Sequence, residues 1–188
     1  MIITAVRVAA VAVAAAVAGS SLAALPAHAQ GSEGKVIART GLVVRYSPSA
    51  NDARSPGNLP YGKVIPIECK VRGTMVDGND LWYSLPPDTH EWVSARYVEN
   101  IGAAPGWCTG GSKGFTGRAT AGLSARRAPN TSDTKVGSYA KGATISIVCK
   151  VDGQGVYGNP RWYYTSKSSW VSARYVSNVG AAPGWCTD

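Results

Sequence analysis

The sequence predicts an all-β protein built from two tandem copies of one small module, each with its own disulfide, behind an N-terminal export signal. Three observations predict it: an internal repeat, apolar residues that alternate with polar ones, and four cysteines in 188 residues. After the first thirty residues, apolar residues hold no helical period over three turns, and glycine and proline are frequent. Such a pattern favours short strands joined by turns.

The first 29 residues have the composition of a secretory signal peptide. Arg7 precedes an alanine and valine run from Val8 to Val17, and Ala27-His28-Ala29 has the pattern of a cleavage site. The run is shorter than the roughly 20 residues that a membrane-spanning helix needs. We therefore expect a signal peptide at 1–29, secretion of the remainder, and no membrane span after cleavage.

The remainder is a duplication. Residues 92–98, Trp-Val-Ser-Ala-Arg-Tyr-Val, recur letter for letter at 170–176, and the Gly-Ala-Ala-Pro-Gly-Trp-Cys of 102–108 recurs at 180–186. Shorter matches keep the same order: Gly41-Leu42 with Gly122-Leu123, Cys69-Lys70-Val71 with Cys149-Lys150-Val151, and Trp82-Tyr83 with Trp162-Tyr163. A repeat of this kind indicates two copies of one structural unit.

These matches predict a first module at residues 34–109, a glycine-rich linker at 110–113, and a second module at 114–188. Four cysteines in an exported chain favour disulfides over a metal or catalytic site, and they allow three pairings. Because a duplicated unit is most simply explained if each copy folds alone, we expect Cys69 to pair with Cys108 and Cys149 with Cys186. Each bridge would contribute about 4 kcal/mol through loop entropy.

Strands are predicted by alternation. Ile65, Ile67, Cys69 and Val71 fall on one face of a strand, and residues 145–151 repeat the pattern with Ile, Ile, Cys and Val. Turn-forming residues at 77–79, Asp-Gly-Asn, and at 158–160, Gly-Asn-Pro, stand just before a Trp-Tyr strand in each copy. Each copy is therefore expected to be a small barrel-like module of short strands.

The motifs in each copy resemble those of the bacterial SH3 (SH3b-like) domain family. Residues 41–48, Gly-Leu-Val-Val-Arg-Tyr-Ser-Pro, are similar to the family's opening "Leu-Asn-Val-Arg-Ser-Gly-Pro" strand and loop, and residues 123–129 are a second version. The later Trp-Tyr and Trp-Val-Ser-Ala-Arg-Tyr-Val resemble its closing strands. This resemblance covers nearly all of both modules, and it implies two SH3-like β-barrels of five or six strands that bind cell-wall peptidoglycan or other envelope components.

The chain departs from that family pattern in two places. The loop of the opening motif is Arg45-Tyr46-Ser47-Pro48 in one copy and Arg126-Arg127-Ala128-Pro129 in the other, so the ligand-side loops differ. The Gly-Ala-Ala-Pro-Gly-Trp-Cys tail and its disulfide are additions to the family pattern.

Aromatic side chains supply the candidate ligand surface, since flat rings with a polar rim suit sugar faces and extended peptides. Those that are identical in both copies are interpreted as core: Trp92, Tyr97 and Trp107, with their counterparts Trp170, Tyr175 and Trp185. Those that vary or flank loops are predicted to bind ligand, with packing as the alternative for about half of them. They are Tyr46, Tyr61, Trp82, Tyr83, Tyr139, Tyr157, Trp162, Tyr163 and Tyr164.

The charge is concentrated in the second copy. Residues 30–110 hold eight basic and eight acidic side chains, whereas residues 111–188 hold ten basic and three acidic ones. A basic half favours contact with an anionic polymer, and solubility is the alternative reading. Arg127 and Lys141 are the cations added to the predicted ligand surface.

No catalytic set is apparent. After cleavage the only histidine is His90, which the sequence places in an exposed loop with no group predicted to hold it as a base. We expect no enzyme activity, cofactor or metal, and no nucleic-acid partner for an exported chain. The predicted function is secreted, non-catalytic binding of cell-wall peptidoglycan or an anionic wall polymer, with the protein free or wall-associated. The alternative is a secreted protein–protein interaction factor or enzyme inhibitor.

Overall fold

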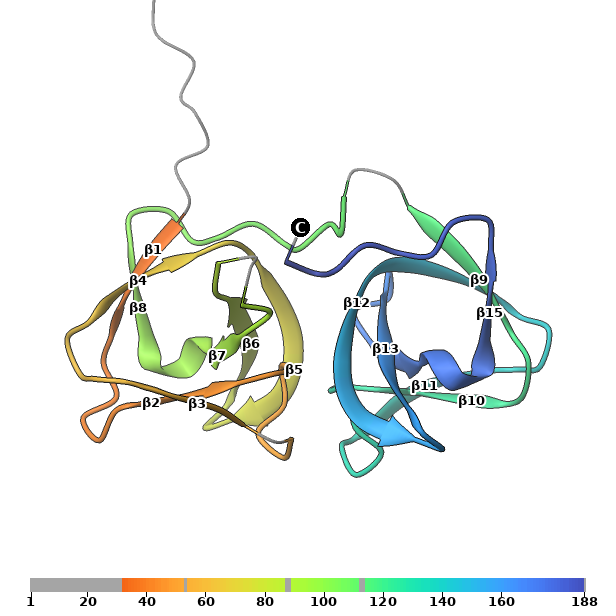
Figure 1. Cartoon of the computed structure of the whole chain (residues 1–188), viewed down its shortest axis with the longest axis horizontal. Helices are drawn as coiled ribbons and strands as arrows, with labels where there is room; N and C mark the ends of the chain where they lie inside the picture. Colours follow the sequence, from red (N-terminus) through yellow and green to blue (C-terminus); the bar gives the residue numbers. More distant parts are fainter. Residues whose placement is uncertain (1–31, 53, 87–88, 112–113, 188) are drawn as a thin grey trace, which may run out of the picture. The chain divides into compact units, whose positions relative to one another are not determined.

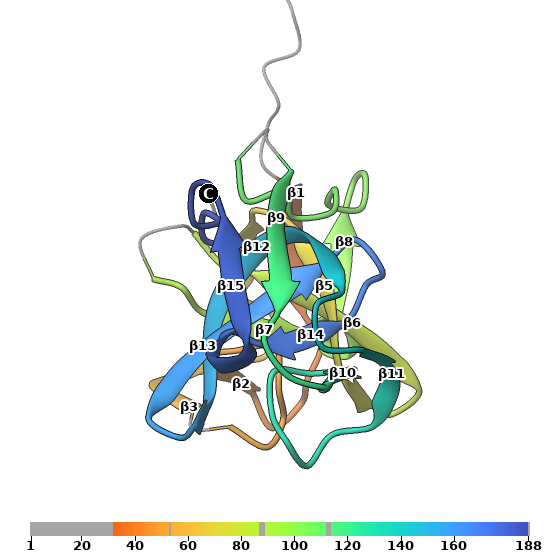
Figure 2. The ribbon, with the colours of Figure 1, turned by 90° about the vertical axis from the view of Figure 1, so that its right-hand side faces the viewer.

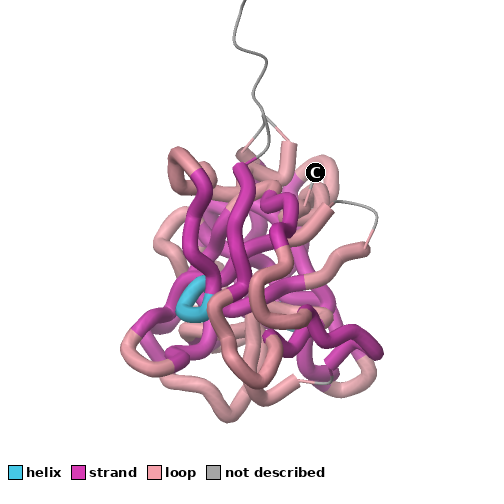
Figure 3. The backbone as a smooth tube through the Cα atoms, turned by 90° about the vertical axis from the view of Figure 1, so that its left-hand side faces the viewer, coloured by secondary structure: helices cyan, strands magenta, loops and turns pink. Residues whose placement is uncertain are grey.

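The computed structural model describes residues 32–52, 54–86, 89–111 and 114–187. The predicted signal peptide and two residues of the predicted linker lie outside these ranges. In the described part the regular structure is strand, drawn in magenta in Figure 3, apart from two 3₁₀ turns, η1 (Ala95–Tyr97) and η2 (Ala173–Tyr175). The prediction of an all-β chain is confirmed.

Eight strands in two antiparallel sheets make up residues 32–101, which we call with their tail to residue 109 the first half (Figure 1). One sheet has the order β4-β1-β8 and the other the order β3-β2-β7-β6-β5. The strands are β1 (Ser32–Val36), β2 (Leu42–Arg45), β3 (Arg54–Leu59), β4 (Val64–Ile67), β5 (Lys70–Val76), β6 (Asn79–Ser84), β7 (Trp92–Ser94) and β8 (Val98–Ile101).

Seven strands in a single sheet make up residues 115–179, which we call with their tail to residue 187 the second half. The order is β11-β10-β14-β13-β12-β9-β15, and Figure 2 shows β9 and β15 side by side at the sheet edge. The strands are β9 (Phe115–Ala119), β10 (Leu123–Arg126), β11 (Lys135–Tyr139), β12 (Thr144–Val156), β13 (Asn159–Thr165), β14 (Trp170–Ser172) and β15 (Val176–Val179).

The two halves repeat the same pairing scheme with one difference. In the second half β12 runs unbroken for 13 residues and pairs with both β9 and β13. In the first half the matching stretch is divided into β4, which pairs with β1, and β5, which pairs with β6. This division at residues 68–69 separates the first half into two sheets.

The predicted turns form the hairpins that join these strands. Asp77 and Gly78 link β5 to β6 with φ of 46° and 82°, and Tyr157 and Gly158 link β12 to β13 with φ of 48° and 80°. Two successive positive φ values match the twist of the flanking strands, which is the reason such turns close hairpins. The first half therefore follows the expected Asp-Gly chemistry, while the second places a tyrosine in the same conformation.

Each half has its own apolar core. In the first, Val36, Val44, Ile67 and Val93 are among the residues that form one buried cluster. In the second, Ala125, Ile145, Ile147, Tyr163 and Val171 belong to the matching cluster. The alternating residues of 65–71 and 145–151 are buried or half-buried as predicted, but they do not share one face: Ile65, Ile67, Ile145 and Ile147 line the separate cores, whereas Cys69, Val71, Cys149 and Val151 belong to or pack against a different cluster.

A third cluster contains residues from both halves. Its members match in pairs across the repeat: Val71 with Val151, Trp82 with Trp162, Trp92 with Trp170, and Cys108 with Cys186. On strands β6, β7, β13 and β14 the tryptophans of this cluster alternate with residues of the separate cores. These four strands thus bury apolar side chains on both faces, which binds the halves into one unit.

Hydrogen bonds cross between the halves at the rim of this shared cluster. Trp170 donates its indole N–H to the carbonyl of Arg72 at 2.7 Å, and the Arg72 amide donates to the Tyr164 hydroxyl at 3.3 Å. Thr74 donates to the Asp133 carboxylate at 2.7 Å, and Asn130 donates to the Ser49 hydroxyl at 2.9 Å. These polar groups are therefore paired across the contact.

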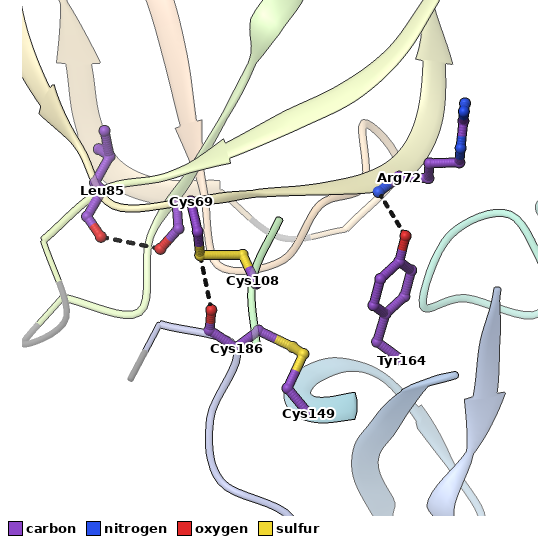
Figure 4. The surroundings of a disulfide bond; sticks show 8 residues. Cys69, Arg72, Leu85, Cys108, Cys149, Tyr164 and Cys186 are labelled. Atoms are coloured by element: carbon purple, nitrogen blue, oxygen red, sulfur yellow. Dashed lines mark hydrogen bonds between the residues drawn. A yellow bond between two sulfur atoms is a disulfide. The ribbon is translucent and has the colours of Figure 1, made fainter. Parts of the chain in front are cut away.

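The disulfides join Cys69 to Cys108 and Cys149 to Cys186, the pairing expected from the duplication. Each tail returns to the strand that carries its partner cysteine, because Lys70 pairs with Trp107 and Lys150 with Trp185 through backbone hydrogen bonds. Figure 4 shows the two bridges close together, with Cys69 Sγ 3.0 Å from the Cys186 carbonyl oxygen. A disulfide sulfur carries no hydrogen, so this is a close contact between the bridges rather than a donated hydrogen bond.

Candidate functional site

Six of the predicted ligand-binding side chains reach the surface. Tyr46, Tyr61 and Tyr157 are 47%, 60% and 84% exposed, and Lys141 is also exposed. Arg127 and Tyr139 are half-buried and line one cavity of about 470 Å³, together with Lys167 and Arg72. Tyr46 lines a different cavity, so the predicted residues do not form one continuous surface.

Three other predicted ligand residues are core residues, and their assignment to a ligand surface was wrong. Tyr83 and Tyr163 lie in the separate cores of the two halves, and Tyr164 lies in the shared cluster with its hydroxyl bonded to the Arg72 amide. In a strand buried on both faces, alternation does not distinguish an exposed side from an inner one. Their rings are therefore closed to a ligand.

Trp82 and Trp162 are also buried, but each forms part of the floor of a groove. Each indole N–H is used inside its own half: Trp82 donates to the Thr74 carbonyl at 2.9 Å, and Trp162 to that of Gln154 at 2.8 Å. These bonds fix the two rings in matching positions. The grooves above them are the feature that the two halves share most closely.

We call these grooves A and B. Groove A, in the first half, has a volume of about 310 Å³, and groove B, in the second, about 230 Å³. All nine residues that line groove B have a counterpart in groove A: Gly122, Leu123, Ser124, Arg126, Thr131, Val156, Trp162, Ser172 and Tyr175 match Gly41, Leu42, Val43, Arg45, Ala50, Val76, Trp82, Ser94 and Tyr97. Duplication has kept this concave surface in both halves.

The arginines of the two grooves are held in the same way. Arg45 donates from Nη1 to the Asp52 carbonyl at 3.1 Å, and Arg126 donates from Nη1 to the Asp133 carbonyl at 2.8 Å. Each bond closes the loop that follows the strand β2 or β10. A guanidinium spreads its donors in a planar fork, so the remaining N–H groups of each arginine are oriented by this contact.

A tyrosine stands at the wall of each groove, at the end of the 3₁₀ turn. Tyr97 is half-buried, and its hydroxyl donates to the Asp77 carboxylate. This hydrogen bond raises the pKa of the Tyr97 phenol above its ordinary value. Tyr175 holds the same place in groove B, where the hairpin residue matching Asp77 is Tyr157. Groove A therefore carries a carboxylate at its rim that groove B lacks.

The sequence predicted core positions for Tyr97 and Tyr175. In the structure both side chains pack against the cores, and both also form the walls of the grooves. The signal was present in the letter-for-letter repeat of residues 92–98 at 170–176. Identity between copies reflects a preserved groove as well as a preserved core.

Trp107 and Trp185 were also expected in the cores, and both lie nearer the surface. Trp107 is 47% exposed, with the Lys70 ammonium 5.4 Å from its ring centroid. Trp185 is half-buried, with the Arg161 guanidinium 4.2 Å from its ring centroid. Cation–π contacts of this kind orient both the ring and the charge.

His90 is not the solvent-exposed loop residue that the sequence predicts. Its ring packs edge-on against Trp185, with 4.5 Å between the ring centroids, and its Nε2 is buried. The histidine thus reaches across from the first half to the tail of the second.

Neither a metal-binding cluster nor a membrane-spanning helix is found among the described residues. No three His, Cys, Asp or Glu side chains among them come together in a way that could hold a metal ion. The same residues include no helix with the length and apolar character needed to cross a membrane.

No protein-family model matches the chain, and no curated protein matches it. Among solved structures the chain is similar to the "Endolysin LysPBC5 CBD", with a TM-score of 0.30 and 11% sequence identity, over 80% of this chain and 96% of that one. A likeness at this TM-score carries no argument about function.

Proposed function

We propose that the chain is a secreted, non-catalytic protein that binds cell-wall peptidoglycan or an associated envelope polymer through grooves A and B. In this proposal residues 1–29 are a cleaved signal peptide. The modules at 34–109 and 114–188 are two SH3-like barrels, and the protein is extracellular or attached to the wall. Its two disulfides are consistent with an oxidising compartment.

The observation that carries the proposal is the repetition of one groove in both halves. A single groove that matched nothing else could be an accident of packing, whereas nine matched lining positions indicate a surface retained through duplication. Two equal binding surfaces on one body suit a ligand that repeats along its length, such as a wall polymer, because linked engagement multiplies affinity by about 10²–10⁴.

The chemistry of the grooves also suits such a polymer. Each combines an apolar floor, a tyrosine ring and an oriented arginine. Rings stack on sugar faces or extended peptides, while the arginine pairs with carboxylate or phosphate. The sequence resemblance to bacterial SH3 domains implies the same class of ligand.

The test is co-sedimentation of the mature, oxidised protein with purified sacculi, before and after removal of anionic polymers. Tyr97→Ala and Tyr175→Ala each remove one groove wall, and we expect each to weaken retention at least tenfold through lost avidity. The double variant should no longer pellet. Tyr97→Phe and Tyr175→Phe retain the ring and serve as folding controls, with melting temperature as the check.

Tyr61→Ala is the matched comparison, since Tyr61 is an exposed aromatic outside both grooves. If its loss abolishes retention while Tyr97→Ala does not, the binding surface lies on the loop before β4 and the grooves are not the site. If the wild-type protein never pellets under any condition, the wall-binding proposal fails, and a soluble protein partner takes its place.

A further inference from the structure

A cavity of about 530 Å³ is lined by both halves, and it is separate from grooves A and B. We call it the His90 cavity. The first half contributes Tyr46, Asp52 and His90 to its lining, and the second contributes Lys150, Trp185 and Thr187. Its volume is within the range of about 300–1,000 Å³ that small-ligand sites occupy.

Two polar atoms in this lining are buried without a partner. Neither Nε2 of His90 nor Oγ1 of Thr187 has a hydrogen-bond partner among the described residues. Thr187 as a whole is only 5% exposed. Buried polar groups are nearly always paired in folded proteins, so two unpaired atoms in one cavity wall point to hydrogen bonds supplied from outside the chain, by ordered solvent or by a ligand that displaces it.

The histidine is held in place at a conformational cost. His90 has a φ of 52°, in the left-handed region that residues other than glycine rarely adopt. Its ring is fixed edge-on to Trp185, at an interplanar angle of 67°. Ser168, the counterpart of His90 in the second half, has a φ of 53°, so this backbone conformation belongs to the loop before β7 and β14 in both halves.

The charges around the His90 cavity nearly cancel. The Lys150 ammonium lies 5.2 Å from the Trp185 ring centroid, and the carboxyl groups of Asp52 and Asp152 also line the wall. Asp152 is paired with Arg161 at 2.8 Å. The cavity of about 470 Å³ has three cations in its wall, Arg72, Arg127 and Lys167; among the described residues only Arg72 is paired with a carboxylate, that of Asp80. The His90 cavity therefore favours a neutral ligand over a polyanion.

From this combination we propose that the His90 cavity binds a neutral saccharide with hydroxyl and N-acetyl groups. Sugar hydroxyls and amides both donate and accept, which is what an imidazole nitrogen and a threonine hydroxyl need. The carboxyl of Asp52 accepts from further hydroxyls, and the half-exposed Tyr46 ring offers an apolar surface for the carbohydrate C–H groups. The inference stands apart from grooves A and B and holds whether or not they bind the wall.

The test is titration of the mature, oxidised protein with chitotriose, with the heat of binding as the readout. Thr187→Val removes only the hydroxyl, and we expect affinity to fall about fivefold to tenfold. Thr109→Val is the matched control, because Thr109 follows Cys108 as Thr187 follows Cys186 but is exposed. It should bind chitotriose as the wild type does. His90→Asn tolerates the left-handed backbone and should weaken binding to a similar extent.

A second readout separates binding from folding. Because Thr187→Val replaces an unpaired buried hydroxyl with a methyl group, the free variant should melt no lower than the wild type even though it binds more weakly. Equal affinity of Thr187→Val and Thr109→Val, or tighter binding of the stem dipeptide L-Ala-γ-D-Glu than of chitotriose, overturns the saccharide assignment. Sacculus retention that depends on Tyr97 and Tyr175 would then still support the proposed function.

Discussion

At the scale of single residues, Asp52 shows how burial and charge compete in this fold. Its carboxyl accepts a hydrogen bond from the Ser47 hydroxyl, and Arg45 lies nearby, and both contacts favour the ionised form. Desolvation by burial is the larger effect and raises the pKa above its ordinary value of 3.8. The folded protein therefore holds this proton more tightly than the unfolded chain does.

The consequence is a testable pH dependence. The charge on Asp52 costs stability at neutral pH, and that cost is relieved as the pH falls through the folded-state pKa, fully so below 3.8. Asp52→Asn has no charge to bury, so we expect it to melt above the wild type at pH 7 and to lose this advantage as the pH approaches 3. Melting temperatures across that range provide the measurement. An advantage that stays constant with pH would contradict the assignment.

The structure of single residues could be predicted from the sequence where it depends on neighbouring residues or on the repeat. The turn at Asp77 and Gly78 and the disulfide pairing follow from local chemistry and from the repeat. The burial of Tyr164 could not be predicted, because the partner of its hydroxyl, the Arg72 amide, lies 92 positions away in the other half. His90 was misjudged for the same reason, since Trp185 comes from the far end of the chain.

At the scale of strands, the middle of β12 approaches a loop of its own half very closely. A Cβ added at Gly153 would lie 2.3 Å from the Pro129 carbonyl oxygen, and one at Gly73 in β5 would lie 2.1 Å from that of Pro48. Both glycines stand where the register with the neighbouring strand shifts. A glycine at such a bulge lets another backbone come near.

Gly153→Ala should therefore be destabilising. We expect a loss of about 1–3 kcal/mol, the usual cost of forcing extra volume into packed structure. Gly155→Ala is the matched control in the same strand, because its Cβ would meet nothing within 4 Å. Urea unfolding followed by tryptophan fluorescence gives both values. A Gly155→Ala loss as large as that of Gly153→Ala would show that the close approach is not the cause.

The strands could be predicted from the sequence, but the burial of both faces of some of them could not. Alternation correctly identified which residues of 65–71 and 145–151 turn away from solvent, but not that the first two of each set and the last two enter different clusters. Nothing in the same pattern indicates that the outer faces of β6 and β13 are covered as well, because Trp82 and Trp162 look like surface aromatics in a one-sided strand. The covering comes from the other half of the chain.

At the scale of the whole molecule, the shared cluster makes the two halves one cooperative unit. Separate modules on a flexible linker would unfold in two independent transitions, but here Trp82, Trp92, Trp162 and Trp170 are buried against one another's strands. Unfolding either half would expose this cluster and remove the hydrogen bond from Trp170 to Arg72. Unfolding one half therefore also destabilises the other half.

We accordingly expect a single calorimetric transition, with a calorimetric enthalpy equal to the van't Hoff enthalpy. Trp170→Phe removes the indole donor to Arg72 and should lower that one transition by several degrees, since about 1 kcal/mol corresponds to about 2–4 °C at this size. Two resolved transitions in the wild type, or a shift confined to one of them in the variant, would show that the halves unfold separately.

The shared cluster also shows what one copy of the repeat would expose on its own. A single ancestral copy would have displayed Val71, Trp82 and Trp92 as an apolar face, and an isologous dimer is the simplest way to cover it. In this chain the other half covers that face instead. In a dimer of identical subunits the two cavities across the interface would have to be alike. Two halves of one chain are free to differ, and one cavity holds His90 and Trp185 while the other holds Arg127 and Lys167.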